Sequence, residues 1–394
     1  MNTIKIHFKY LFFFIGCISA YFWIIPVTSI PGLDFEMSFS NRIIRTIYPL
    51  FLFFFSYKFI FKKTSKNNIL IFTCLFFLLP VFILMFLFSN YLLTIYLPIF
   101  VSFFGLIILS VLSKNNFYYW YFGASFISFI FFFLGITKFG FEPTTFYGRP
   151  RVHFGFIHPV QTSSIIIGAF SFLVLLTNRI KNRIILKTIA QILIYIFFAI
   201  FLFLAQSSNL FIGFHIIILL FFIFKWKNLF VFKKFILLIL LTAPFLTLLL
   251  LNLPKESLEL LDDLTSGRLL NYKQLMFENL ANENIFTILI GPTNYLRILI
   301  SNNDVTGFAS RDSVYLSFLL SFGFLGLFAL IFFLFLIGNK LIKINDKSFS
   351  VFCGVIFIYI ADAQGLTPNN LIIYSGLAFT LNQYINRSKL TVSL

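Results

Sequence analysis

A short stretch of this chain, from Arg149 to His158, holds two arginines and two histidines within ten residues. A guanidinium binds phosphate or carboxylate through parallel N–H donors and stays charged at any physiological pH. Pro159 suits the first turn of a following helix, and the positive end of that helix attracts anions. The segment therefore predicts an anion site, with a basic anchor at a membrane surface as the alternative.

A second polar segment, 254–311, carries another arginine in a helical pattern. Thr265-Ser266-Gly267 can cap a helix that continues through Arg268. The apolar residues that follow recur at three- and four-residue spacing: Leu269, Tyr272, Leu275, Met276 and Leu280. We expect an amphipathic helix that lies on the outer membrane surface and holds Arg268 near the lipid headgroups.

The elements that must position these residues are apolar helices. Of 394 residues, 60% are hydrophobic and 11% charged, and the mean hydropathy is +0.97, which excludes a water-soluble enzyme. A transmembrane helix takes about 20 apolar residues, so we expect an all-α polytopic membrane protein with about 12 spans. The expected spans are 10–30, 43–61, 69–88, 91–113, 117–138, 159–177, 184–205, 210–224, 235–253, 312–337, 348–361 and 369–385.

The distribution of charge predicts the orientation of these spans. With the N-terminus in the cytoplasm, the inner segments hold 20 of the 30 basic residues and one of the 13 acidic residues. This bias follows the positive-inside rule and places both termini in the cytoplasm. The net charge of +17 is then mostly membrane anchoring, and no nucleic-acid partner is implied. Residues 1–394 form a single integral membrane domain, with outer loops at about 139–158 and 254–311.

The outer loops prefer arginine to lysine. Of the 10 basic residues assigned to the outside, seven are arginines, although the whole chain has twice as many lysines as arginines. Salt bridges to outer acidic residues are one explanation, and binding of phosphate or carboxylate is the other. The chain has no phosphate-binding loop or dinucleotide glycine pattern, so a reaction that uses a cytosolic nucleotide is not expected.

Four motifs in order resemble a known family. They are R-x-H-x-G-F-x-H-P from Arg151, S-G-R at Ser266, D-S-x-Y-L from Asp312, and G-x-x-G at Gly323. Their order and shared outer placement, with about twelve spans, resemble the O-antigen and capsule repeat-unit polymerases and the related O-antigen ligases. The resemblance covers about residues 145 to 337 and implies a GT-C-like glycosyltransferase architecture.

That resemblance implies an activity in the bacterial cytoplasmic (inner) membrane. Such polymerases move a glycan from undecaprenyl pyrophosphate onto another lipid-linked repeat unit, without a cofactor. By position, Arg149, Arg151 and Arg268 would hold the pyrophosphate, and Asp312 or His158 would help to deprotonate the acceptor hydroxyl. Arg268, Asp312 and His158 are thus the catalytic candidates. The remaining candidates for substrate binding are His153, Gln161, Tyr272, Arg311 and Tyr315. The partners implied are membrane lipids, a flippase and a chain-length regulator.

Three alternatives remain open. An O-antigen ligase uses the same donor with another acceptor, but ligases carry His-Asn where this chain has Arg311-Asp312-Ser313, which favours the polymerase. A flippase is expected to carry basic residues inside the bundle, and the predicted spans are nearly free of charge. A metal-dependent glycosyltransferase would use acidic residues in the first outer loop, where Asp34 and Glu36 lie.

Overall fold

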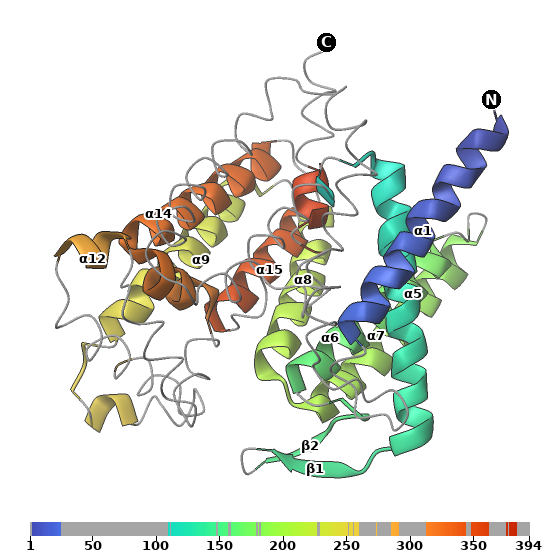
Figure 1. Ribbon diagram of the computed structural model, residues 1–394, viewed down its shortest axis with the longest axis horizontal. Helices are drawn as coiled ribbons and strands as arrows, with labels where there is room; N and C mark the ends of the chain where they lie inside the picture. Colours follow the sequence, from blue (N-terminus) through green and yellow to red (C-terminus); the bar gives the residue numbers. More distant parts are fainter. Residues whose placement is uncertain are drawn as a thin grey trace, which may run out of the picture. The chain divides into compact units, whose positions relative to one another are not determined.

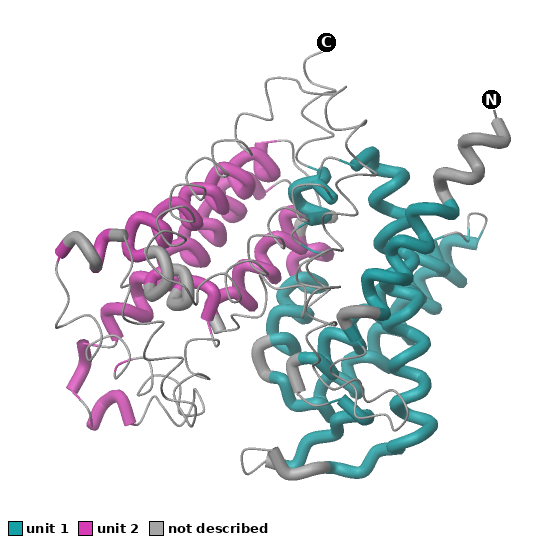
Figure 2. Tube along the Cα trace, viewed as in Figure 1, with its two compact units in different colours: residues 1–63, 101–219, 367–394 teal, residues 64–100, 220–366 magenta. Residues whose placement is uncertain are grey.

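Helices dominate the part of the chain that the structure, a computed structural model, describes (Figure 1). That part comprises residues 2–24, 109–110, 112–146, 149–156, 159–178, 180, 183–226, 229–250, 252–254, 256–259, 273, 285–290, 313–343, 348–361, 376 and 378–383. Within these ranges, one two-stranded hairpin is the exception to the helical fold. The chain falls into two compact units, one of residues 1–63, 101–219 and 367–394 and the other of residues 64–100 and 220–366 (Figure 2).

Four helical segments are long and apolar enough to cross a membrane: α5 (Lys114–Phe139), α7 (Ile184–Ala205), α9 (Phe230–Leu250) and the Gly323–Lys343 part of α14. At a rise of about 1.5 Å per residue, 21 residues span about 30 Å, the thickness of a bilayer core. Large apolar side chains stand exposed on them, such as Ile185 (77%) on α7 and Val231 (79%) on α9. The structure therefore indicates a multi-pass membrane protein.

The described helices correspond to only some of the predicted spans. The spans expected at 43–61 and 69–88, and nearly all of 91–113, lie outside the described residues. The described helices overlap the expected ranges, but several ends differ: α1 covers Asn2–Ile24 rather than 10–30, α9 begins at Phe230 rather than 235, and α14 ends at Lys343 rather than 337. The number of about 12 spans therefore stays a prediction.

In the first unit, α1 (Asn2–Ile24) packs closely against α5 through facing glycines. A Cβ atom at Gly16 would collide with the carbonyl oxygen of Trp120, and one at Gly123 with that of Phe13. The close approach lets Cys17 Sγ donate to the Gly123 carbonyl oxygen at 3.5 Å. Small residues at a crossing are a typical way of packing helices in lipid.

The start and end of α5 are fixed by local hydrogen bonds. Ser113 caps the start, where its Oγ accepts from the Asn116 N–H at 3.3 Å. Gly140, at φ +60°, ends the helix and donates its N–H to the Ile136 carbonyl oxygen. The chain then enters β1 (Pro143–Phe146), which pairs antiparallel with β2 (Arg149–Val152). The sequence predicted a loop at 139–158 and did not predict this hairpin.

The rest of the first unit is helical. Helix α6 (Pro159–Thr177) packs against α5 and α7, and α7 also contacts β2. Helix α8 (Ser208–Trp226) follows, and its residues up to Leu219 belong to this unit. The hairpin thus lies where α5 ends, α6 begins and α7 passes by (Figure 1).

The second unit is built on α9, α14 (Val314–Lys343) and α15 (Ser348–Ala361), with the short α12 (Ile285–Ile290) against α14. Gly338 of α14 contacts Leu237 of α9 and Phe352 of α15 so closely that a Cβ atom would collide with both. Gly323, at φ +64°, interrupts α14 inside the span predicted at 312–337, a break that the sequence had not predicted. Glycine allows this left-handed conformation because it has no Cβ.

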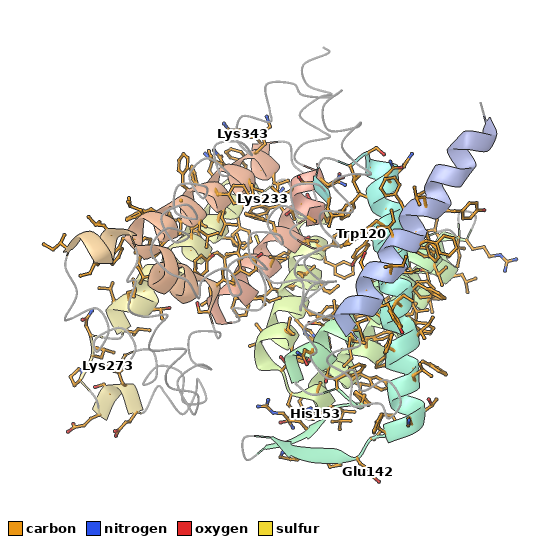
Figure 3. The ribbon with its side chains drawn as sticks, viewed as in Figure 1. Trp120, Glu142, His153, Lys233, Lys273 and Lys343 are labelled. Carbon is orange, nitrogen blue, oxygen red and sulfur yellow. The ribbon has the colours of Figure 1, made fainter. Side chains whose placement is uncertain are left out.

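Lysines mark opposite ends of the second unit. Lys233 and Lys343 lie at one end, where α9 begins and α14 ends (Figure 3). Lys273, from the long segment predicted to be extracytoplasmic, lies at the other end (Figure 3). Its Nζ donates to the Leu253 carbonyl oxygen at 2.8 Å, just beyond α9. Lys273 therefore contacts the backbone just beyond the end of α9. Lys233 is buried (1% exposed).

Candidate functional site

The candidate site is the junction between β2 and α6, which brings four predicted residues onto one continuous piece of structure. Arg149 and Arg151 belong to β2 and pair with Phe146 and Thr144 of β1. Arg151 is partly exposed, while the side chain of Arg149 lies outside the described atoms. Gln161 lies in the first turn of α6. His153 lies between strand and helix, beside the hairpin (Figure 3).

A tight turn from His153 to Phe156 connects the two elements. The Phe156 N–H donates to the His153 carbonyl oxygen at 3.0 Å, and the His153 Nδ1 lies 3.2 Å from the Phe156 carbonyl oxygen. Phe154 (φ +48°) and Gly155 (φ +77°) both adopt left-handed backbone. A Cβ atom at Gly155 would also collide with the ring of Phe139. The glycine of the R-x-H-x-G-F motif is therefore required by backbone conformation and by packing.

Aromatic packing holds this turn on the helical scaffold. Phe154 is 2% exposed, and its ring centroid lies 6.0 Å from that of Phe132 on α5 and 5.5 Å from that of Phe201 on α7. Phe141 completes the cluster at 5.9 Å. Positive φ at a residue other than glycine costs about 1–3 kcal/mol and persists only where the surroundings enforce it. The buried ring provides that enforcement, so the turn is rigid.

Polar side chains begin α6. Thr162, which is fully buried, donates its hydroxyl to the His153 carbonyl oxygen at 3.1 Å and so ties the helix to the turn. On either side of it, the Gln161 Oε1 and the Ser163 Oγ are buried and make no hydrogen bond within the described part of the chain. Buried polar atoms without partners are rare in proteins, and each calls for an explanation.

The electrostatics keep His153 neutral. Burial lowers the pKa of the imidazole below its usual 6.5, the nearby Arg151 guanidinium lowers it further, and the hydrogen bond to Phe156 opposes both. Because Nδ1 faces a carbonyl oxygen, the neutral ring carries its proton on Nδ1. Its Nε2 is then a hydrogen-bond acceptor. The charge of the described junction thus comes from Arg151 rather than from the histidine.

The remaining predicted site residues lie in the second unit or outside the described residues. Tyr315 lies in the first turn of α14, in the second unit, and is 3% exposed. Its neighbour Ser313 donates to the Tyr359 carbonyl oxygen at 3.4 Å. Five candidates lie outside the described residues: His158, Arg268, Tyr272, Arg311 and Asp312. The amphipathic helix predicted from Arg268 also lies there, as do Asp34 and Glu36.

Sequence reasoning missed three parts of this site. It missed the hairpin, although Thr144, Thr145 and Phe146 favour a strand and the following Tyr147-Gly148 favours a turn. It missed the role of Thr162, because the partner of its hydroxyl is a backbone carbonyl oxygen, which no sequence pattern identifies. It also missed the burial of Phe154, because phenylalanine is common throughout this chain.

No protein-family model, curated protein or solved structure matches this chain.

Proposed function

We propose that this protein is a multi-pass membrane glycosyltransferase that polymerises undecaprenyl-pyrophosphate-linked oligosaccharide repeat units into a cell-surface polysaccharide. The reaction takes place at the outer face of the bacterial cytoplasmic membrane, and the product is an O-antigen or a capsule. The anomeric C–O bond to the pyrophosphate breaks as an acceptor hydroxyl oxygen bonds to the same carbon. The hydroxyl proton passes to a base, and undecaprenyl pyrophosphate leaves.

The observation that carries this proposal is the position of Arg151. It lies on a strand that is paired with β1, contacted by α7 and followed by a turn packed into an aromatic cluster. A guanidinium carried on a strand that is fixed in this way can stabilise negative charge that develops on a leaving pyrophosphate, because its backbone needs no rearrangement during the reaction. A mobile anchor of the membrane surface would need no such support.

The roles of the other residues follow the sequence pattern. Arg149 and Arg268 join Arg151 in holding the pyrophosphate, and His158 or Asp312 takes the proton of the acceptor hydroxyl. A flippase that supplies the repeat units and a chain-length regulator are the expected partners. An O-antigen ligase is the second candidate, because it uses the same donor and the same arginine chemistry.

Deletion of the gene and complementation in the host separate these functions. Loss of a polymerase leaves cell-surface glycans that carry a single repeat unit. Loss of a ligase leaves long glycans that remain attached to undecaprenyl pyrophosphate. Loss of a flippase leaves single lipid-linked units on the cytoplasmic side. Single-unit glycans that the wild-type gene restores to full length support the proposal, and either of the other patterns contradicts it.

A further inference from the structure

The start of α14 carries three buried hydrogen-bond donors for which the described part of the chain shows no acceptor. The helix begins at Val314, so the backbone N–H groups of Val314 and Tyr315 have no acceptor within the helix. No backbone acceptor outside the helix is described for them either. The Tyr315 hydroxyl is buried and makes no hydrogen bond within the described residues. Because Val314 is 0% and Tyr315 3% exposed, bulk water does not reach these donors.

The Tyr315 side chain is aimed at the N-terminal end of α14. Ser313, which immediately precedes the helix, donates its hydroxyl to the Tyr359 carbonyl oxygen of α15 at 3.4 Å. The Tyr315 phenol also lies close enough to the Tyr359 phenol for the two groups to interact electrostatically. Tyr315 therefore reaches the same residue of α15 as Ser313 does. Side chains of a helix lean toward its N-terminus, which agrees with this placement. The phenol thus lies beside the end to which the free N–H groups point.

These donors select the chemistry of the ligand. Backbone N–H groups only donate hydrogen bonds, and a phenol adds a further donor. The helix runs for about two and a half turns from Val314 to the break at Gly323, so its dipole adds positive potential at this end. A complementary ligand must therefore offer several acceptor oxygens and a negative charge. Phosphate has both, and helix N-termini bind it through such N–H groups.

The buried phenol favours a binding role over a packing role. A buried polar group without a partner lowers stability, whereas phenylalanine would fill nearly the same space without this cost. Proteins keep such unfavourable groups mainly where function requires them. Ser313 behaves differently, because its hydroxyl bonds to the backbone of α15 and holds the two helices together. The Tyr315 hydroxyl makes no such bond within the described residues.

We infer that the start of α14 binds a phosphate group through the N–H groups of Val314 and Tyr315 and through the Tyr315 hydroxyl. The source of the phosphate rests on the proposed function. A polymerase holds two lipid-linked repeat units at once, a donor and an acceptor, and the arginines of β2 are assigned to the donor. The site on α14 then binds the pyrophosphate of the acceptor lipid, which does not react. The protein accordingly has two pyrophosphate sites, one in each compact unit.

Native mass spectrometry of the full-length protein tests this number of sites, because it resolves complexes with one and with two bound lipids. The protein is kept in a maltoside detergent without phosphate, and the probe is undecaprenyl pyrophosphate. We expect the wild-type protein to bind two molecules. Tyr315→Phe should weaken one of the two sites by about 10- to 100-fold, as for one lost hydrogen bond to a charged group, and Arg151→Ala should weaken the other.

Two further results separate phosphate binding from a structural role of Tyr315. Without lipid, Tyr315→Phe should unfold at the same temperature as the wild-type protein or at a higher one, because it removes an unsatisfied hydroxyl. A structural hydroxyl would instead give a lower unfolding temperature and unchanged lipid binding. Val314→Pro removes one N–H donor at a helical position that suits proline, so it should weaken the same site as Tyr315→Phe.

Tyr195→Phe is the matched control. Tyr195 lies within α7, where its ring contacts those of Phe214 and His215. It lies far along the helix from the start of α7, so its loss of a phenol should leave both sites unchanged. Phosphatidylglycerol is the second probe, because its headgroup is also a phosphate. We expect the α14 site to bind it more weakly than undecaprenyl pyrophosphate.

The outcomes distinguish the inference from the proposed function. One bound lipid that Arg151→Ala removes and Tyr315→Phe retains overturns the inference but not the proposed function. Two lipids bound as tightly by both Tyr315→Phe and Val314→Pro as by the wild-type protein overturn it as well. Equally tight binding of phosphatidylglycerol at the site weakened by Tyr315→Phe overturns the assignment to the acceptor lipid. A wild-type protein that binds no undecaprenyl pyrophosphate overturns the proposed function, and the inference with it.

Discussion

The starts of α6 and α14 both carry polar residues after an arginine-containing segment, but their structures differ. These residues are Gln161, Thr162, Ser163 and Ser164 in α6, and Ser313 and Tyr315 in α14. In α6, the Thr162 hydroxyl bonds to a fixed turn, and the buried polar atoms on both sides have no described partner. In α14, Ser313 bonds to the backbone of α15, and Tyr315 is buried.

This difference shows that a motif does not define a site by itself. At the start of α6, a strained turn and a hairpin place a cation and several acceptors on one support. At the start of α14, the described polar residues connect two helices of a core. The supporting elements therefore determine whether polar residues at a helix start hold two helices together or attach the helix to a strained turn. The variants below distinguish the two arrangements.

Loss of an arginine from β2 should have the largest effect. Arg151→Ala removes a fixed guanidinium, and we expect polymerisation to fall by about 100- to 1,000-fold, as for one lost donor at a developing charge. Arg183→Ala, at the N-cap of α7, is the matched control and should keep near wild-type activity. The measurement is glycan chain length in complemented cells at equal protein level. Full-length glycans from Arg151→Ala would contradict the role of the hairpin.

Substitution of the glycine in the turn should cause the largest loss of stability. Gly155→Ala imposes a left-handed backbone on alanine and also a collision with Phe139, so we expect a loss of several kcal/mol of stability. Gly140→Ala has a similar positive φ, but nothing lies within 4 Å of its Cβ position. Thermal unfolding in detergent should therefore show a clearly larger loss for Gly155→Ala. Equal losses would mean that the turn is not packed as described.

The pH dependence of stability should report His153. Burial, together with the nearby Arg151 guanidinium, lowers the pKa of the folded-state imidazole below 6.5, whereas the unfolded chain keeps the usual value. The unfolded chain therefore binds this proton more readily, so the free energy of unfolding should fall as the pH drops below about 6.5.

Two variants test that assignment. His153→Asn should remove this part of the acidic loss of stability. Arg151→Gln removes a positive charge that lowers the pKa, so it should make the loss smaller. Thermal unfolding between about pH 4.5 and 8 provides the measurement. The same acidic loss in wild-type protein and His153→Asn would assign it to another group.

The smallest effects should come from single hydroxyls. Thr162→Val removes a buried hydrogen bond and leaves the His153 carbonyl oxygen with one partner fewer, at a cost of about 1–2 kcal/mol. Tyr315→Phe removes a buried hydroxyl that has no hydrogen-bond partner in the described part of the chain, so stability should stay equal or rise. Thermal unfolding of both variants checks the comparison. Destabilisation by Tyr315→Phe would reveal a partner for its hydroxyl.

The sequence predicted the helices well and their connections poorly. Long apolar runs identify α5, α7 and α9 because burial in lipid requires about 20 apolar residues in a row. The break at Gly323 escaped prediction, since a glycine inside an apolar helix is compatible with a straight span. The positions of Arg149, Arg151 and Gln161 next to one helix start followed from their spacing. The contacts of Thr162 and Phe154 depend on tertiary packing, which no local pattern encodes.

The most direct test of the central claim is polymerisation by the purified full-length protein, supplied only with undecaprenyl pyrophosphate that bears the host repeat unit, with and without EDTA. We expect a ladder of glycans with increasing numbers of repeat units, unchanged by EDTA. A ladder that requires a divalent cation would move the chemistry to Asp34 and Glu36. The absence of any ladder from folded protein that binds the lipid would contradict the account.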